Sequence, residues 1–331
     1  MTQFISRRQF GLLAVAGLAA TQVQAASPAH IPVPGAGQKI ARIGDDFEDP
    51  KWEYIPNGTK SSYNLDKKIR VPGGIARNDL WFEAALRGQP DVVKRVATPE
   101  GGIPGSEGSL LLATLNPGIP GQHSPESQQD DIIHNVKGRL GGALPVFQTP
   151  SITTRVFIPA MEKWERRNGS SFGFRAGLRA THTKVDKETK VSEREEYWPG
   201  FFIQHNFKQD QYGGVHAKST LVIRSDLYGR DIEGPEVDAS SWWTLGMSFT
   251  SDGQVHYFAK AGIDDLTAED YLASHFPYKY RAYALETLFY NVITADNGRT
   301  WSTPWVVDDP AFFMHTPVDR GRMASPGQLQ R

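Results

Sequence analysis

Apolar and polar residues alternate along much of the chain after about residue 40, with the period of two that is typical of β-strands. The alternating segments are short, and turn signals such as Asn168-Gly169 and Asp252-Gly253 separate them. The pattern predicts strands at residues 152–158, 172–180, 201–207, 220–224, 242–250, 255–261 and 287–294. Because no long helical segments alternate with these strands, their spacing favours an all-β antiparallel sandwich or barrel.

Helical signals are few. Residues 267–270 (Thr-Ala-Glu-Asp) form a capping-box pattern that predicts a short helix reaching Ser274, and Ser124-Pro125 predicts another one-turn helix. Several Pro and Gly breaks in residues 80–135 predict long loops over one face, and the charged run 182–196 predicts a solvated hairpin loop. We expect one β domain over residues 41–315, followed by a tail at 316–331.

The first 25 residues have the order of a secretory signal. Arg7-Arg8 precede an apolar run at residues 11–20, and Val23-Gln24-Ala25 has the small-x-small pattern of a signal cleavage site. The segment Ser6-Arg7-Arg8-Gln9-Phe10 resembles the twin-arginine export pattern, which implies a bacterial protein delivered by that export machinery to the periplasm or beyond. The apolar run is shorter than the about 20 residues of a membrane span, so we expect cleavage and no membrane anchor. Residues 26–40, rich in Pro, Gly and Ala, are expected to be a linker.

Composition narrows the function classes. Hydrophobic residues make up 39% of the 331 residues, which is enough for a core, and the net charge of -1 argues against a nucleic-acid binder. The chain has 0 cysteines, which excludes disulfides, thiolate catalysis and cysteine-ligated metals. The sequence has no P-loop, dinucleotide fingerprint, Gly-x-Ser-x-Gly elbow or helical His cluster, so it lacks the signatures of those enzyme classes.

Strand polarity suggests a ligand-binding face. In residues 172–181, Phe172 and Phe174 fall on one side of the strand, and Arg175 and Arg179 on the other. Guanidinium and carboxamide groups bind carboxylates and hydroxyls, and sugar rings stack on aromatic side chains, so a polysaccharide groove fits this face. An ordinary solvated or loop-covered face is the alternative. The residues expected to bind the substrate are Arg155, Arg175, Arg179, Asn206, Trp242 and Asn291.

The acidic segment Asp45-Asp46-Phe47-Glu48-Asp49 places four carboxylates within five residues. Such a group either gathers on a hard cation such as Ca²⁺ or disperses in solvent. The segment resembles the opening of concanavalin A-like jelly rolls, which include secreted lectins, laminarinases and polysaccharide lyases. This resemblance implies an antiparallel jelly-roll β-sandwich with a structural Ca²⁺, which we expect at Asp46 or Glu48. An acidic turn without an ion is the alternative.

Two further segments resemble alginate-lyase-like enzymes. Residues 257–262 (Tyr-Phe-Ala-Lys-Ala-Gly) are similar to their Tyr-Phe-Lys-Ala-Gly element, and residues 202–205 (Phe-Ile-Gln-His) are similar to their Gln-x-His strand. The resemblance implies β-elimination of an acidic glycan, in which cationic or amide groups neutralise a uronate carboxylate while a base removes the C5 proton. We expect Arg175, Arg179 and Gln204 at the carboxylate. The candidates for the base are His205, His256 and Tyr257, and Lys260 is a further expected catalytic residue. His205 is adjacent to Gln204 and falls on the apolar side, as a core histidine.

Two other functions stay open. The same groove serves a lectin if it binds sugar without cleaving it, and a glycoside hydrolase would need two carboxylates about 5–9 Å apart. Glu193 and Glu195 share one face of a strand and are the candidates for that pair. Residues 294–301 match the Asp-box pattern, which predicts a structural hairpin whose turn is capped by Asp296, with Gly298 at positive φ and Trp301 packed underneath.

Overall fold

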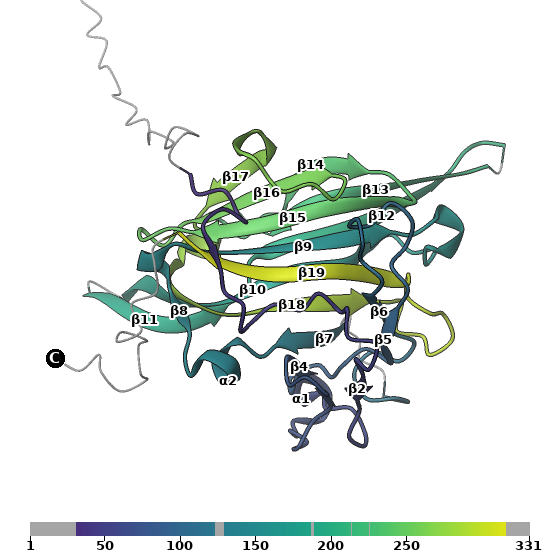
Figure 1. Cartoon of the computed structure of the whole chain (residues 1–331), viewed down its shortest axis with the longest axis horizontal. Coiled ribbons are helices and arrows are strands. Elements are labelled where there is room, and N and C mark those ends of the chain that lie inside the picture. Colours follow the sequence, from purple (N-terminus) through teal and green to yellow (C-terminus); the bar gives the residue numbers. More distant parts are fainter. Residues whose placement is uncertain (1–30, 123–128, 187–188, 213, 225, 316–331) are drawn as a thin grey trace, which may run out of the picture.

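The computed structural model describes residues 31–315, except 123–128, 187–188, 213 and 225. Two antiparallel sheets stack face to face in this part of the chain (Figure 1), which confirms the predicted all-β jelly-roll sandwich. Sheet A has the strand order β17-β16-β15-β9-β19-β6-β5, with β1 also paired to β19. Sheet B has the order β14-β13-β12-β10-β18-β7-β4-β3-β2, with β11 paired to β10 and β8 to β18. None of the helices in the described part of the chain is long and apolar enough to cross a membrane.

The strands of sheet A are β1 (Gln38–Lys39), β5 (Val92–Val96), β6 (Ser109–Ala113), β9 (Pro150–Ile158), β15 (Ser241–Phe249), β16 (Val255–Ala261), β17 (Tyr271–His275) and β19 (Trp305–Met314). Those of sheet B are β2 (Tyr54–Ile55), β3 (Ile75–Ala76), β4 (Trp81–Glu83), β7 (Gln129–His134), β8 (Leu144–Pro145), β10 (Gly169–Asp186), β11 (Thr189–Tyr197), β12 (Gly200–Gln209), β13 (Val215–Arg224), β14 (Ile232–Val237) and β18 (Arg281–Ile293). The short helices are α1 (Tyr63–Asp66) and α2 (Val136–Leu140), with 3-10 turns η2 (Val146–Gln148), η3 (Met161–Lys163), η4 (Ala268–Asp270) and η5 (Pro277–Lys279).

The core lies between the sheets and is rich in aromatic rings. Phe172 of β10 packs against Tyr290 of β18 at 5.7 Å and against Trp305 of β19 at 5.1 Å, measured between ring centroids. All three side chains are fully buried, and burying a large apolar side chain contributes roughly 1.5–3 kcal/mol. The predicted inward face of β10 is therefore correct, and the side chains on its other face point out of the sandwich.

The N-terminal acidic segment is tied into the fold by one carboxylate. Asp45 Oδ2 accepts hydrogen bonds from Trp52 Nε1, Trp81 Nε1 and Asn78 Nδ2, each at 2.9 Å, while Oδ1 accepts from the backbone amide of Phe47 at 3.1 Å. Burial raises the pKa of the Asp45 carboxyl, and the hydrogen bond from Trp52 opposes this shift most strongly. The carboxylate thus joins the incoming chain to the indole of β4 and to the loop before it.

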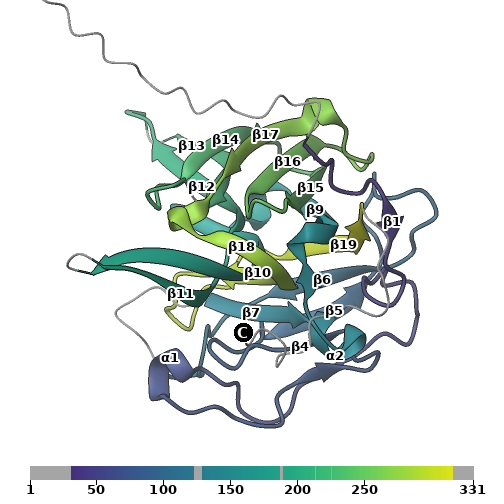
Figure 2. The same ribbon diagram turned by 90° about the vertical axis from the view of Figure 1, so that its left-hand side faces the viewer.

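Three local expectations differ from the structure. Residues 80–135 contain strands β4, β5, β6 and β7 rather than mainly loops, since these short segments pair with neighbours far away in the sequence. The charged run at 182–196 lies in the long β10–β11 hairpin, which projects from the sandwich in Figure 2. The capping box of Thr267 and Asp270 is present, but the helix ends at Asp270 because β17 follows and pairs with β16.

The Asp-box hairpin joins β18 to β19. Gly298 has the expected positive φ of 62°, but the turn is capped by Asn297, whose Oδ1 accepts from the amides of Arg299 and Thr300 at 2.9 and 2.8 Å. The Trp301 side chain is 48% exposed, so the prediction that it packs underneath the turn is wrong.

Several other expectations concern residues 1–30, 124–125 and 316–331, which lie outside the described residues. The export signal, the one-turn helix at Ser124-Pro125 and the C-terminal tail therefore stay predictions. Within the segment expected to be a linker, residues 38 and 39 form β1.

Replacing the Asp45 carboxylate tests its role in stability. In Asp45→Ala, the Trp52, Asn78 and Trp81 donors lose their acceptor, and each unsatisfied buried donor costs about 1–3 kcal/mol. We expect the free energy of unfolding, measured by urea denaturation, to fall by about 3 kcal/mol or more. The exposed neighbour Asp46 provides the control, because Asp46→Ala is expected to change stability by less than about 0.5 kcal/mol. Equal losses in the two variants would contradict this role.

Candidate functional site

The outer face of sheet B presents an arginine on an aromatic floor. Arg175 of β10 lies opposite Phe289 of β18 and Gly200 of β12 in the strand register. Its guanidinium carbon is 5.4 Å from the ring centroids of both Phe202 and Phe289. Its Nε also donates to the backbone carbonyl of Trp198 at 2.9 Å. These contacts fix the position of the charge while leaving the side chain half-buried rather than enclosed.

The neighbouring row of side chains supplies acceptors. Asp131 of β7 pairs in register with Asn291 of β18, and Asn291 Nδ2 donates to Asp131 Oδ1 at 2.5 Å. Gly173 of β10 pairs in register with Asn291 of β18, and a Cβ at Gly173 would lie 2.6 Å from Asn291 Oδ1. Because Gly173 has no side chain, the side-chain amide of Asn291 can lie over β10 at this position. Among the described residues, Asn291 Oδ1 is buried without a hydrogen-bond partner.

A cavity of about 680 Å³ opens over these residues. Its floor comes from β7, β10 and β18, and its walls come from residues 70–75 and 82–87 together with the β11–β12 turn. The lining residues that bear on ligand binding are Phe82, Arg87, Asp131, Arg175, Trp198 and Phe289. With Arg70 and Glu83, which also line it, the cavity combines three guanidinium groups, two carboxylates and three aromatic rings, a set that suits a polar ligand with flat apolar faces. We call it the sheet B groove.

The charges in the sheet B groove are partly compensated. Burial lowers the pKa of Arg175 to about 10, while the negative charge of Asp131 acts against that shift, so Arg175 stays protonated at neutral pH. Burial raises the pKa of Asp131, and the nearby charge of Arg87 and the hydrogen bond from Asn291 oppose this. Arg87 Nε lies 4.0 Å from Asp131 Oδ2. An anionic group could therefore bind Arg175 without breaking a short ion pair between Arg175 and another described residue.

The structure groups five of the predicted residues on sheet B. Arg175 lines the groove. Asn291 lies in the adjacent row but is fully buried and does not line it, and Arg179 forms an ion pair with Glu286 away from the lining. Gln204 and Asn206 project from the same outer face on β12 but lie beyond the residues that line the cavity. Of the predicted residues, Arg175 therefore lines the groove, and Asn291 lies beneath its edge and holds Asp131.

The other polar residues of the predicted site lie on the opposite side of the molecule. Arg155, Trp242, His256 and Lys260 belong to β9, β15 and β16 and project from the outer face of sheet A. The expectation of one shared groove is wrong, because strand alternation assigns each side chain to a face but not to a sheet. The two segments that resemble alginate-lyase-like enzymes, in β12 and β16, likewise lie on different sheets.

The polar groups on sheet A already have protein partners. Arg155 donates to Asp309 and Asp265, each at 2.7 Å, and His256 bonds to Thr250 at 2.8 Å and to Ser274 at 2.6 Å. Trp242 Nε1 donates to the carbonyl of Glu100 at 3.2 Å, and Lys260 Nζ lies 3.8 Å from Asp270. The N-terminal segment, purple in Figure 1, crosses this face, where Ser248 donates to the carbonyl of Pro32 at 2.6 Å. The face is therefore a covered surface, which was the alternative interpretation of the polar strands.

Two candidate bases are inside the sandwich. Tyr257 is fully buried, and its hydroxyl donates to the carbonyl of Arg224 at 3.1 Å, which contradicts its assignment as a base in contact with substrate. His205 stacks on Trp164 at 4.4 Å and hydrogen-bonds to Ser219 and Thr303, as expected for a core histidine. Desolvation lowers the pKa of both His205 and His256 to about 4, so neither is charged at neutral pH.

The two carboxylates of the hydrolase alternative are on the β10–β11 hairpin. Glu193 is exposed, and Glu195 accepts a hydrogen bond from the Tyr280 hydroxyl at 2.5 Å. Neither residue lines the sheet B groove.

The side chains proposed as calcium ligands accept hydrogen bonds from backbone amides. Asp46 Oδ1 accepts from the amide of Glu48 at 3.2 Å, and the Glu48 carboxylate accepts from the amides of Glu107 and Gly108 at 3.0 and 3.4 Å. Within the described ranges, no three or more His, Asp or Glu side chains gather as a metal site would require. Calcium at Asp46 or Glu48 stays a prediction.

Sequence analysis missed Arg87, Asp131, Phe289 and the backbone of Trp198 as parts of the site. Residues 129–131 (Gln-Asp-Asp) were visible as a polar cluster, but they form β7, whose pairing with β18 places Asp131 beside Asn291. A signal was present in the strand alternation, because Asp131 and Ile133 share the outward side of that strand. The contribution of residues 82–87 to the groove wall depends on contacts between segments far apart in the sequence, so it has no local sequence signature.

Comparison with known proteins gives structural similarities only. No family model and no curated protein matches the chain. An alginate lyase from Pseudomonas aeruginosa is 8% identical with a TM-score of 0.35, over 68% of this chain and 87% of that one. A glucuronan lyase from Trichoderma reesei is 11% identical with a TM-score of 0.33, over 79% and 94%. A GH131 β-glucanase catalytic domain from Podospora anserina is 8% identical with a TM-score of 0.37, over 81% and 86%. These are concanavalin A-like jelly rolls, and at this similarity they assign no activity to the chain.

The burial of His205 predicts that the unfolding free energy depends on pH. The pKa of this histidine is about 4 in the folded protein and near 6.5 when unfolded, so only the unfolded state binds the proton between these values. Its contribution to stability is therefore lost as pH falls from about 6.5 towards 4. Between pH 7 and pH 5, we expect the wild type to lose about 2 kcal/mol more unfolding free energy than His205→Gln, measured by urea denaturation. Parallel pH profiles for the two proteins would show that His205 is not buried as a neutral group.

Proposed function

We propose that the protein is carbohydrate-active and binds an acidic polysaccharide in the sheet B groove. The observation that carries this proposal is Arg175, a protonated guanidinium held on Phe202 and Phe289 at the floor of a cavity of about 680 Å³. A uronate carboxylate can accept two parallel hydrogen bonds from a guanidinium, which a neutral sugar does not offer.

The other groups in the groove match the remaining surfaces of a sugar. The Asp131 carboxylate, which lines the groove and is held by Asn291 Nδ2, is an acceptor for ring hydroxyls. Phe82, Trp198 and Phe289 offer apolar faces on which the C–H side of a sugar ring can stack. Together with the export signal expected at the N-terminus, these features support a role in handling polysaccharide outside the cytoplasm.

As the finer proposal, the protein is a lyase that cleaves the acidic glycan by β-elimination. Arg175 neutralises the uronate carboxylate, which acidifies the C5 proton. A base then removes this proton. The C5 proton passes to the base, a C4–C5 double bond forms, the C4–O bond breaks, and the departing oxygen takes up a proton.

Binding is tested by removing the guanidinium. In Arg175→Ala the charged hydrogen bonds to the carboxylate are lost, so we expect the affinity for short uronate oligosaccharides, measured by calorimetry, to fall about 10- to 100-fold. Arg299→Ala, which removes an exposed arginine from the β18–β19 loop, is the matched control and should bind as the wild type does. Equal binding of carboxyl-reduced oligosaccharides by the wild type would refute recognition of the carboxylate.

The lyase proposal is tested by ultraviolet absorbance, which rises when an unsaturated uronate forms. Alginate, glucuronan and pectin are the substrates, and Arg175→Ala is expected to lower the rate at least about 100-fold, because the carboxylate is no longer neutralised. If the wild type binds a polyuronate but produces neither absorbance nor new reducing ends, the protein is a lectin. New reducing ends without absorbance would indicate a hydrolase.

A further inference from the structure

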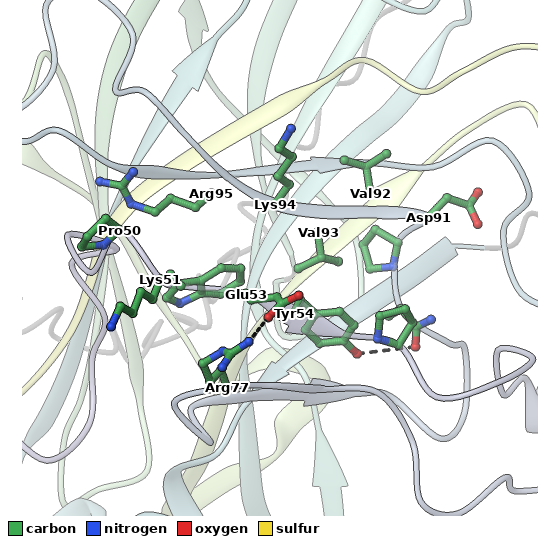
Figure 3. A pocket seen from close by; sticks show the side chains of 14 residues that line it. Pro50, Lys51, Glu53, Tyr54, Arg77, Asp91, Val92, Val93, Lys94 and Arg95 are labelled. Carbon is green, nitrogen blue, oxygen red and sulfur yellow. Dashed lines mark hydrogen bonds and ion pairs between the residues drawn. The ribbon is translucent and has the colours of Figure 1, made fainter.

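A second cavity lies at the open edge of the sandwich, between the edge strand β5 of sheet A and the edge strand β2 of sheet B. It has a volume of about 870 Å³ and shares no lining residue with the sheet B groove. We call it the edge cleft. Figure 3 shows Lys51 and Arg77 on one side of it and Lys94 and Arg95 on the other.

Positive charge exceeds negative charge in the edge cleft. Arg77 is paired with Glu53, and Asp91 is held by the buried Lys60 at 2.9 Å. Lys51 and Lys94 are exposed and form no ion pair with any residue that the structure describes. The two lysines therefore remain available to an anionic ligand, and they approach it from opposite walls.

Protection of an exposed strand edge does not explain this arrangement. Proteins commonly place lysine on an edge strand to prevent pairing with another sheet, and Lys94 on β5 suits that role. Lys51 precedes β2 on the facing wall, so it does not protect the edge of β5 from pairing with another strand. The cleft also has a rigid apolar lining, to which Pro50, Pro56 and Pro90 contribute. Exposed lysines from two separate chain segments therefore flank one cavity on opposite sides.

We infer that the edge cleft is a second binding site for the chain of an acidic polysaccharide, and this inference rests on the proposed function of the sheet B groove. Lysine ammonium groups bind carboxylates or sulfates along such a chain, while the half-exposed carboxylate of Glu53 accepts its hydroxyls. A sugar unit offers several hydroxyls beside its charge for the Glu53 carboxylate to accept, whereas the phosphates of a nucleic acid backbone offer no donor to it. A polymer long enough to occupy both sites gains avidity that a short oligosaccharide does not.

The test uses the full-length mature protein with Lys51→Ala and Lys94→Ala combined. Both side chains are exposed, so the fold is expected to be retained. The matched control combines Lys137→Ala and Lys163→Ala, which remove two exposed lysines elsewhere. Affinities for long polyuronate and for short uronate oligosaccharides are measured side by side. We expect the first double variant to bind the polymer at least about tenfold more weakly and the oligosaccharide unchanged, whereas the control matches the wild type in both.

Combining these changes with Arg175→Ala separates the two proposals. Arg175→Ala alone should retain weak binding of the polymer through the edge cleft, and adding the Lys51 and Lys94 changes should abolish it. If the wild type binds neither oligosaccharide nor polymer, the proposed function fails. If it binds both and the lysine changes leave polymer affinity unaltered, only the second site is overturned. A similar loss of binding to DNA or polyglutamate would refute an acidic polysaccharide as the specific occupant.

Discussion

Strand alternation is the constraint on which this structure depends. Each long strand gives every second side chain to the aromatic core around Phe172, Tyr290 and Trp305, so only the remaining side chains are available to ligands. A two-layer sandwich has two such outer faces, which the core separates. Polar groups on Arg175 and Lys260 therefore cannot meet, although both project away from the interior.

The two outer faces have different roles because different segments cover them. On sheet A, the N-terminal segment and the loop after β16 satisfy the polar groups, as in the hydrogen bonds of Arg155 to Asp265 and Asp309. On sheet B, the loop at residues 70–75 forms a wall and leaves the groove open above Arg175. Asp45 contributes to this arrangement, because its carboxylate fixes the path of the chain that leads into these walls. The accessibility of each outer face thus depends on how loops are anchored as much as on the strands.

The sequence was sufficient to predict the β-sandwich, the inward face of β10 and the core position of His205, because each follows from local alternation. It was insufficient for the site, since the pairing of β7 with β18 and the separation of β12 from β16 are long-range choices of topology. The same limit explains why four strands within residues 80–135 appeared to be loops. The structural role of Asp45 was also out of reach, because the three donors that converge on its carboxylate come from later segments of the chain.

The most direct measurement is a crystal structure of the protein bound to a short acidic oligosaccharide. Our account predicts that a uronate carboxylate lies against the guanidinium of Arg175, with ring hydroxyls towards Asp131 and a sugar face on Phe289. An oligosaccharide seated on the outer face of sheet A beside His256 and Lys260, or one in the sheet B groove with its carboxylate turned away from Arg175, would contradict it.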